Sequence, residues 1–313
     1  MAPVFQRCVD FKRALLPALA TMSRFFKQLR LAFWRAFEHD AFGVAKGAAF
    51  SAILTFFPAI LVLASILSRS QSSGVFVREI FRAVGRVLPE GTNTAVTEYV
   101  TGAKPVPTQF LVWISILTLW TASGVMISWM EGFRKAYQMP KVWGLVKERL
   151  IAFQLVVMAG FPMGFASFLV VFGNQIERWA MYHGGHELTP YILGLWTAVR
   201  WIIATLTSIA VIGLVYHHGV PRTQPWHRVL PGSVVATVLW VAVTVLFGWY
   251  LRHYANYGVI YGSVGTAIAL LIWLYLVSMV VLIGAEFNSL RYPRFLFGAH
   301  SDFGSPQKRV AAL

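Results

Sequence analysis

A stretch of 31 consecutive residues, 255–285, contains no Asp, Glu, Lys or Arg. A water-soluble helix of that length needs a polar face, and this stretch has none. About 20 apolar residues are enough to cross the hydrocarbon core of a bilayer as a helix. The stretch therefore predicts a transmembrane helix and indicates a membrane protein.

The rest of the chain has the same character, because 57% of its residues are hydrophobic and only 12% are charged. Charge-poor windows recur, and they predict six transmembrane helices at 43–67, 110–130, 150–173, 193–216, 230–251 and 262–285. The expected fold class is all-α, a polytopic membrane protein with six transmembrane helices and amphipathic helices at the interface. The expected parts are a cytoplasmic segment 1–41, a transmembrane domain 42–288 and a cytoplasmic tail 289–313.

The distribution of Lys and Arg orients these helices. With a cytoplasmic N-terminus, 18 of the 27 basic residues fall in inside segments and 7 in outside segments. Inside loops carry the excess of basic residues, so both termini are expected to be cytoplasmic. Much of the positive charge behind the net +15 then faces the anionic lipids of the inner leaflet. Membrane lipids are thus the expected partners, nucleic acid is not needed, and a homo-oligomer is left open.

Two further stretches are expected to lie at the membrane surface. In residues 23–40 the apolar residues Phe25, Leu29, Phe33 and Phe37 follow helical spacing among basic residues, which is typical of an interfacial amphipathic helix. The outer segment 68–109 carries a second apolar stripe and is too long for a simple connector. It is expected either to gate the bundle or to form a structural apron.

Ionisable side chains inside a span are costly, so they are the first candidates for function. Arg200 lies about 10 Å below the outer surface at 1.5 Å per residue, where it either binds an anionic group or snorkels to the interface. Lys46 lies close to the cytoplasmic side and can snorkel more easily. Glu131 and Glu286 end the second and sixth spans, where a carboxylate opposes the helix dipole and needs a partner.

Local partners differ for the two carboxylates. Glu131 has Arg134 and Lys135 three and four residues on, at the spacing that brings helical side chains together. Glu286 has no such neighbour, and pairing with Lys46 from the first span is the specific hypothesis.

The start of the sixth span combines glycines with tyrosines. Gly258, Gly262 and Gly265 would let another helix backbone approach closely. Tyr257 and Tyr261 would line an outer vestibule or belong to an interfacial aromatic belt.

Enzyme signatures are absent from the sequence. The eight histidines form no metal-binding cluster, and no P-loop or nucleophile elbow occurs. The single cysteine, Cys8, excludes an intramolecular disulfide. The chain is therefore expected not to be an enzyme and to carry no metal or cofactor.

Several short motifs, in this order, resemble the YihY/virulence factor BrkB family of bacterial inner-membrane proteins. They are Gly47-Ala48-Ala49, Phe57-Pro58, Leu119-Trp120-Thr121-Ala122-Ser123-Gly124, Arg200-Trp201, the stretch from Tyr216 to Pro221, Pro231-Gly232, Trp240, Tyr257, Tyr261-Gly262, Trp273-Leu274-Tyr275 and Gly284-Ala285-Glu286-Phe287-Asn288. The resemblance covers about 43–288 and implies six helices in the inner membrane, with roles in transport or export. The family has also carried a ribonuclease label, against which the missing catalytic constellation argues.

The leading functional expectation is a transporter or exporter of an amphipathic, lipid-like or anionic solute. Arg200 would engage an anionic group, and Glu286 with Glu131 would serve as gating or proton-coupling carboxylates. Lys46, Tyr257, Tyr261 and Asn288 complete the set of substrate or gating candidates. The alternatives are a non-transporting membrane scaffold for envelope or lipid-synthesis partners and, more remotely, a membrane-bound nuclease.

Overall fold

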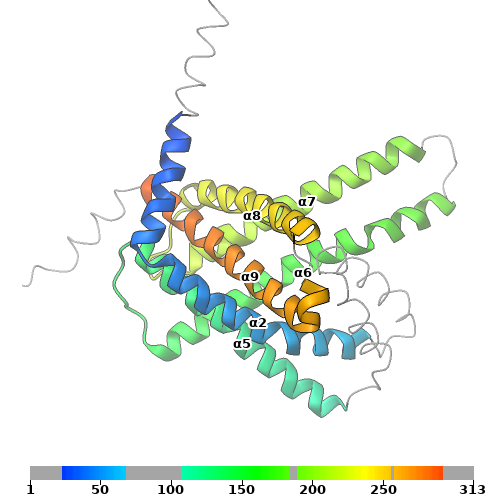
Figure 1. Ribbon diagram of the computed structural model, residues 1–313, viewed down its shortest axis with the longest axis horizontal. Helices are drawn as coiled ribbons and strands as arrows, with labels where there is room; N and C mark the ends of the chain where they lie inside the picture. Colours follow the sequence, from blue (N-terminus) through cyan, green and yellow to red (C-terminus); the bar gives the residue numbers. More distant parts are fainter. Residues whose placement is uncertain (1–22, 68–106, 184–188, 255–256, 292–313) are drawn as a thin grey trace, which may run out of the picture.

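The computed structural model describes residues 23–67, 107–183, 189–254 and 257–291, and these ranges are helical apart from short connections. The all-α prediction is therefore confirmed for this part of the chain. A helix over residues 23–38, here called the N-terminal helix, precedes six long helices (Figure 1). The six are α2 (Ala41–Leu67), α5 (Thr108–Ala136), α6 (Leu145–His183), α7 (Thr189–His218), α8 (Trp226–Tyr254) and α9 (Tyr257–Arg291). The predicted outer segment 68–109 lies almost entirely outside the described residues.

Each of these six helices is long and apolar enough to cross a membrane. All six predicted spans fall inside the observed helices, so their number and order are confirmed for the described part of the chain. The helices extend beyond the predicted limits because polar turns at their ends continue the backbone hydrogen bonding. The last turns of α5, for example, carry Glu131, Arg134 and Lys135 and remain helical through Ala136.

The helices are arranged as a ring. Each one packs against the next in the chain, α9 closes the ring onto α2, and α5 also reaches across to α9. We call the end where the N-terminal helix joins α2 the proximal end, and the opposite end the distal end. In Figure 1, α6 and α7 run together and extend away from α8 and α9 toward the distal end.

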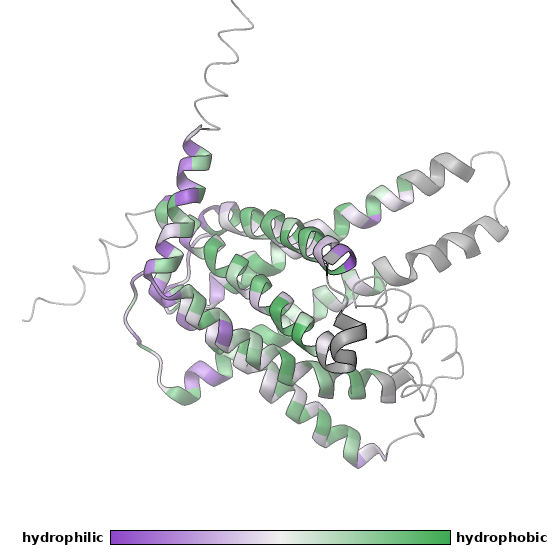
Figure 2. Cartoon of the chain, viewed as in Figure 1, coloured by the Kyte–Doolittle hydropathy of each residue, from purple (hydrophilic) through white to green (hydrophobic). Residues whose placement is uncertain are grey.

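Much of the outer surface is apolar. Large side chains on the helix surfaces are exposed, such as Phe161 at 81% and Trp113 at 65%. Figure 2 shows hydrophobic residues along the helices, whereas hydrophilic residues gather on the N-terminal helix and at the proximal end. A soluble protein rarely exposes so large a contiguous apolar surface, so this distribution fits helices surrounded by lipid.

The N-terminal helix joins the bundle through small residues. Ala32 and Ala36 are fully buried, whereas Phe33 and Phe37 on the predicted apolar stripe are more than half exposed. The aromatic residues are therefore left facing outward, as expected for a helix at a membrane surface. Asp40 ends the segment and accepts a hydrogen bond from the Gly43 backbone N–H at 3.2 Å, which caps the start of α2.

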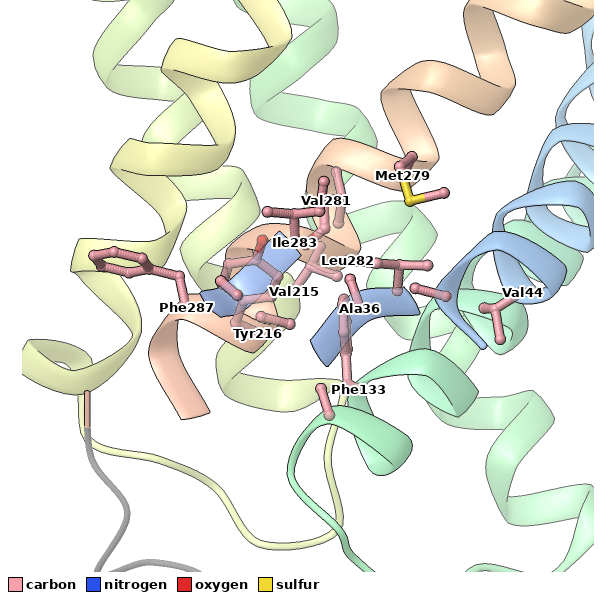
Figure 3. Close-up of a cluster of buried hydrophobic side chains, with 14 of the residues drawn as sticks. Ala36, Val44, Phe133, Val215, Tyr216, Met279, Val281, Leu282, Ile283 and Phe287 are labelled. Carbon is pink, nitrogen blue, oxygen red and sulfur yellow. Dashed lines mark hydrogen bonds between the residues drawn. The ribbon is translucent and has the colours of Figure 1, made fainter. Parts of the chain in front are cut away.

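The main hydrophobic core lies at the proximal end. Figure 3 shows the core side chains of α9 converging with those of α2, α5, α7 and the N-terminal helix. Residues at its centre, including Phe133, Val215 and Leu282, are 2% exposed or less. The ring is thus most tightly packed at the proximal end.

Candidate functional site

Helices α8 and α9 approach each other closely at Gly232 and Gly284. A Cβ atom on Gly284 would lie 2.7 Å from the Gly232 carbonyl oxygen and 2.8 Å from the Ala236 Cβ. A Cβ on Gly232 would in turn overlap the Gly284 carbonyl oxygen and the Asn288 side chain. Only glycine at both positions allows this contact, as in other small-residue interfaces between transmembrane helices.

The Asn288 side chain, near the end of α9, forms hydrogen bonds with the start of α8. Its Oδ1 accepts a hydrogen bond from the Gly232 N–H at 2.7 Å, and its Nδ2 donates to the Val229 carbonyl at 3.0 Å. Pro231 lies between these two residues and has no N–H, so the ordinary helical bonding is interrupted there. The side-chain amide therefore links α9 to α8 through backbone groups on either side of Pro231.

Tyr216 joins α7 to the same place. Its hydroxyl donates to the Val281 carbonyl at 2.5 Å, and its ring meets Phe133 edge to face, with the ring centroids 5.1 Å apart. Tyr216 is fully buried. We call the residues His39, Tyr216, Gly232, Gly284, Glu286 and Asn288 the proximal node.

Glu286 is 1% exposed, and its partner is His39. The His39 Nδ1 and Glu286 Oε1 atoms are 2.6 Å apart, and the Ser289 hydroxyl lies 3.4 Å from Oε2. The hypothesis that Glu286 pairs with Lys46 is wrong. Lys46 is exposed, because the buried positions of this part of α2, Val44, Ala45 and Ala48, lie on the opposite face of the helix.

Asp40, the neighbour of His39, extends the polar contacts to α5. Lys135 Nζ lies 3.2 Å from Asp40 Oδ2 and 3.4 Å from Glu131 Oε1. Of the two partners expected for Glu131, Lys135 is therefore confirmed. Glu131 is half exposed and lies at the rim of the proximal end rather than against Glu286.

Arg134, the other expected partner of Glu131, pairs with Glu148 instead. Glu148 is 4% exposed and also lies 3.3 Å from Lys141 Nζ. Two cations thus neutralise one buried carboxylate, and together they fix the connection between α5 and α6.

A second buried polar group, Tyr137, follows α5 beside the proximal node. Burial raises the pKa of its hydroxyl above the ordinary range, so it stays protonated. The side-chain amides of Asn288 and Gln224 lie beside the hydroxyl and offset part of that effect, although neither forms a hydrogen bond of good geometry with it.

Arg200 lies inside the candidate span of α7 and is 6% exposed. Its Nη2 lies 3.4 Å from the Thr197 hydroxyl, one turn earlier on the same helix. The side chain is buried in the bundle rather than exposed on the helix surface. Whether Arg200 binds an anionic group stays a prediction.

The predicted residues at the start of α9 are placed only in part. Gly265 is buried. Tyr257, Gly258, Tyr261 and Gly262 belong to the first turns of α9, but their side chains lie outside the described part of the structure, so their roles stay predictions.

The structure thus brings together the motifs on which the family resemblance rests. Tyr216, Pro231-Gly232 and Gly284–Asn288 are far apart in sequence and meet in the proximal node. Sequence reasoning missed His39, Tyr137 and Glu148. In the sequence, His39 stands out only as a histidine just before the first span. Tyr137 and Glu148 stand out only as a tyrosine and a glutamate in the otherwise basic stretch between the second and third spans. Within the described ranges, no three His, Cys, Asp or Glu side chains are grouped to hold a metal ion.

Six long apolar helices and a buried polar node at one end define a polytopic, all-helical membrane protein. The family model described as virulence factor BrkB matches residues 15–301. The chain therefore belongs to the virulence factor BrkB family, as the resemblance predicts.

Two of the relatives that the chain matches over most of its length are named membrane proteins. A UPF0761 membrane protein of Tolumonas auensis is 27% identical over 268 residues, which cover 82% of this chain and 83% of that protein. A UPF0761 membrane protein of Chlorobium phaeobacteroides is 26% identical over 273 residues, or 82% of this chain and 55% of its own length. The putative ribonuclease-like protein YfkH of Bacillus subtilis is 33% identical over 180 residues, 57% of this chain and 64% of YfkH, just under two thirds of its length. No solved structure matches the chain.

Proposed function

We propose that this protein moves an amphipathic, lipid-like or anionic solute across the bacterial inner membrane. The observation that carries the proposal is Arg200, a guanidinium that is 6% exposed within a membrane span. Charged side chains at such depth are costly and are kept mainly where they bind or move something. A guanidinium is suited to a phosphate or carboxylate, which it can hold through two parallel hydrogen bonds.

The proximal node is the proposed gate. It closes the ring at one end, and the Glu286–His39 pair ties the N-terminal helix to α9. A solute that leaves at this end requires the pair to separate, which gives Glu286 a gating or proton-coupling role. Glu131, at the rim and paired with Lys135, would act on the approach to the gate.

We further propose that both termini are cytoplasmic and that the basic flanks bind anionic lipids of the inner leaflet. The distribution of Lys and Arg supports this orientation. Cys8 is the single cysteine and therefore a ready reporter. In intact spheroplasts a membrane-impermeant maleimide should label Cys8 only after the membrane is permeabilised. Equal labelling before permeabilisation would place the N-terminus outside.

The proposed role is not enzymatic, because the sequence contains no catalytic constellation. YfkH is named a putative ribonuclease-like protein, so nuclease activity is the alternative to test in the same preparation. Purified protein is expected to leave RNA intact with and without divalent metal. Cleavage that follows the protein through purification would replace the transport proposal.

The transport proposal is tested with purified protein in liposomes that contain a fluorescent phosphatidylglycerol and a trapped anionic dye. Protein-containing liposomes are expected to move at least one of these probes faster than protein-free liposomes. If neither moves, the scaffold alternative is favoured. That alternative also predicts that Arg200→Ala is tolerated in cells, whereas changes on the outward helix faces are not.

A further inference from the structure

Another arginine, Arg149, lies near the start of the candidate membrane span of α6, beside α5. Arg149 lies four residues into α6, and its guanidinium carbon lies 4.0 Å from the centre of the Trp120 indole ring and 5.7 Å from that of Phe153. Such stacking is typical of arginine and fixes the plane of the guanidinium. Its Nη2 also donates to the Trp120 backbone carbonyl at 3.1 Å.

This contact draws the guanidinium toward the apolar part of α5. Trp120 lies eleven residues before Glu131, the first charged residue at the proximal end of that helix. At 1.5 Å per residue this is about 16 Å along α5. Measured along α6, however, Arg149 is only about 6 Å from the start of the helix. The guanidinium therefore lies deeper in the membrane than the charged end of α5. It is still close enough to the start of α6 to reach the phosphate layer of that leaflet.

Arg149 has no carboxylate partner among the described residues. The adjacent Glu148 already binds Arg134 and Lys141. A guanidinium has five N–H donors, and one of the five is used on Trp120, while the Nε donor is buried without a hydrogen-bond partner. A cation in this position calls for an anion from outside the chain.

The surface next to Arg149 is apolar and open to lipid. On α5, Trp113, Leu117 and Trp120 follow one another at helical spacing and are 51–65% exposed. On the neighbouring α6, Val157 and Phe161 form an exposed row in the same direction. Both rows lead from Arg149 toward the distal end, since α5 begins there and α6 runs toward it (Figure 1).

We propose that Arg149, Trp120 and Phe153 form a binding site for an anionic phospholipid. The phosphate accepts hydrogen bonds from the Arg149 guanidinium, and one acyl chain lies along the exposed rows of α5 and α6. A free phosphate offers the same oxygens but cannot use the apolar rows, so the site selects a lipid. The site does not depend on transport, because a chain that moves no solute can still hold a lipid here.

The test is native mass spectrometry of the full-length protein, delipidated in detergent and titrated with phosphatidylglycerol, phosphatidylcholine or inorganic phosphate. Wild-type protein is expected to retain at least one phosphatidylglycerol and to bind phosphatidylcholine about tenfold more weakly. Arg149→Gln should weaken the tightest phosphatidylglycerol site about tenfold. Arg149→Lys, which keeps the charge but loses the planar stacking, should weaken it by a smaller factor.

Lys147→Gln is the matched control, because it removes an exposed positive charge from the same turns of α6 without touching Trp120. It is expected to bind phosphatidylglycerol as the wild type does. Equal loss in the two glutamine variants would reduce the effect to bulk charge and overturn the site. Unchanged binding in Arg149→Gln, or displacement of the lipid by millimolar inorganic phosphate, would overturn it as well. If Arg149→Gln does not fold, Arg149→Lys must bind phosphatidylglycerol more weakly than the wild type. An unchanged phosphatidylglycerol affinity of Arg149→Lys would then overturn the site.

Discussion

His39 and Asp40 form the joint between the N-terminal helix and α2, and their side chains reach two other helices. His39 contacts Glu286 on α9, whereas Asp40 contacts Lys135 on α5 and caps α2. Asp40 also has a positive φ of 58°, a conformation that Asp adopts more readily than most residues. Two adjacent residues thus set how the N-terminal helix is held against the bundle.

The coupling between His39 and Glu286 can be measured with a double-mutant cycle. His39→Ala and Glu286→Gln should be non-additive by about 1–3 kcal/mol, because the two side chains are in direct contact at a buried site. Lys46→Ala is the control, and with Glu286→Gln it should be additive to within about 0.5 kcal/mol. The measurement is thermal unfolding in detergent. A stronger coupling of Glu286 to Lys46 than to His39 would instead support the pair of Glu286 and Lys46.

Tyr137 makes stability depend on alkaline pH. Its pKa is raised by burial above the ordinary value of 10.0, so the phenol is neutral in the folded state. The stabilisation is complete below pH 10 and is lost as the pH rises toward the raised pKa, because the unfolded chain releases the proton first. Between pH 8 and 11 the unfolding temperature should therefore fall more for the wild type than for Tyr137→Phe. Tyr250 is nearly half exposed, so Tyr250→Phe serves as the control. Its unfolding temperature should fall with pH as that of the wild type does.

At the scale of helices, the contact between α8 and α9 depends on two glycines. Gly284→Ala places a methyl group against the Tyr216 hydroxyl and the Gly232 carbonyl and should destabilise the protein by about 1–3 kcal/mol. Gly160→Ala and Gly164→Ala on α6 meet nothing within 4 Å and should be neutral or stabilising by up to about 1 kcal/mol. Unfolding temperatures of the three variants in detergent check this. Similar temperatures for all three would mean that the close contact is not present.

The helices themselves could be predicted from the sequence, whereas their contacts could not. Each span is a long apolar run, and hydrophobic length alone determines that such a run crosses a bilayer. His39 and Glu286 are 247 residues apart, so no local spacing relates them. The same holds for Tyr216 and Val281, which meet only when α7 packs against α9. Arg149 and Trp120 lie on consecutive helices but are still 29 residues apart, beyond the reach of local spacing.

At the scale of the whole molecule, the ring is closed most firmly at the proximal end. The node there joins α7, α8, α9 and the N-terminal helix through side-chain hydrogen bonds, and α5 reaches α9 beside it at Gly132 and Leu282. Sequence reasoning identified Glu286 and Asn288 at this end, because polar residues that close an apolar span stand out. It misjudged the partner of Glu286, since helix rotation, which turns Lys46 outward, is not visible in a charge pattern.

The most direct test of the proposed transport is the head-group selectivity of flux in liposomes. The rates are compared for a fluorescent phosphatidylglycerol and for a phosphatidylcholine with the same chains, using wild-type protein, Arg200→Gln and Arg252→Gln. Arg252 is an exposed arginine on α8 that donates to the carbonyl of its own Gly248, so it controls for loss of charge alone. We expect the wild type and Arg252→Gln to favour the anionic lipid about tenfold, which corresponds to about 1.4 kcal/mol, and Arg200→Gln to lose that preference. An equal preference in all three proteins, or no flux through the wild type, would contradict the account.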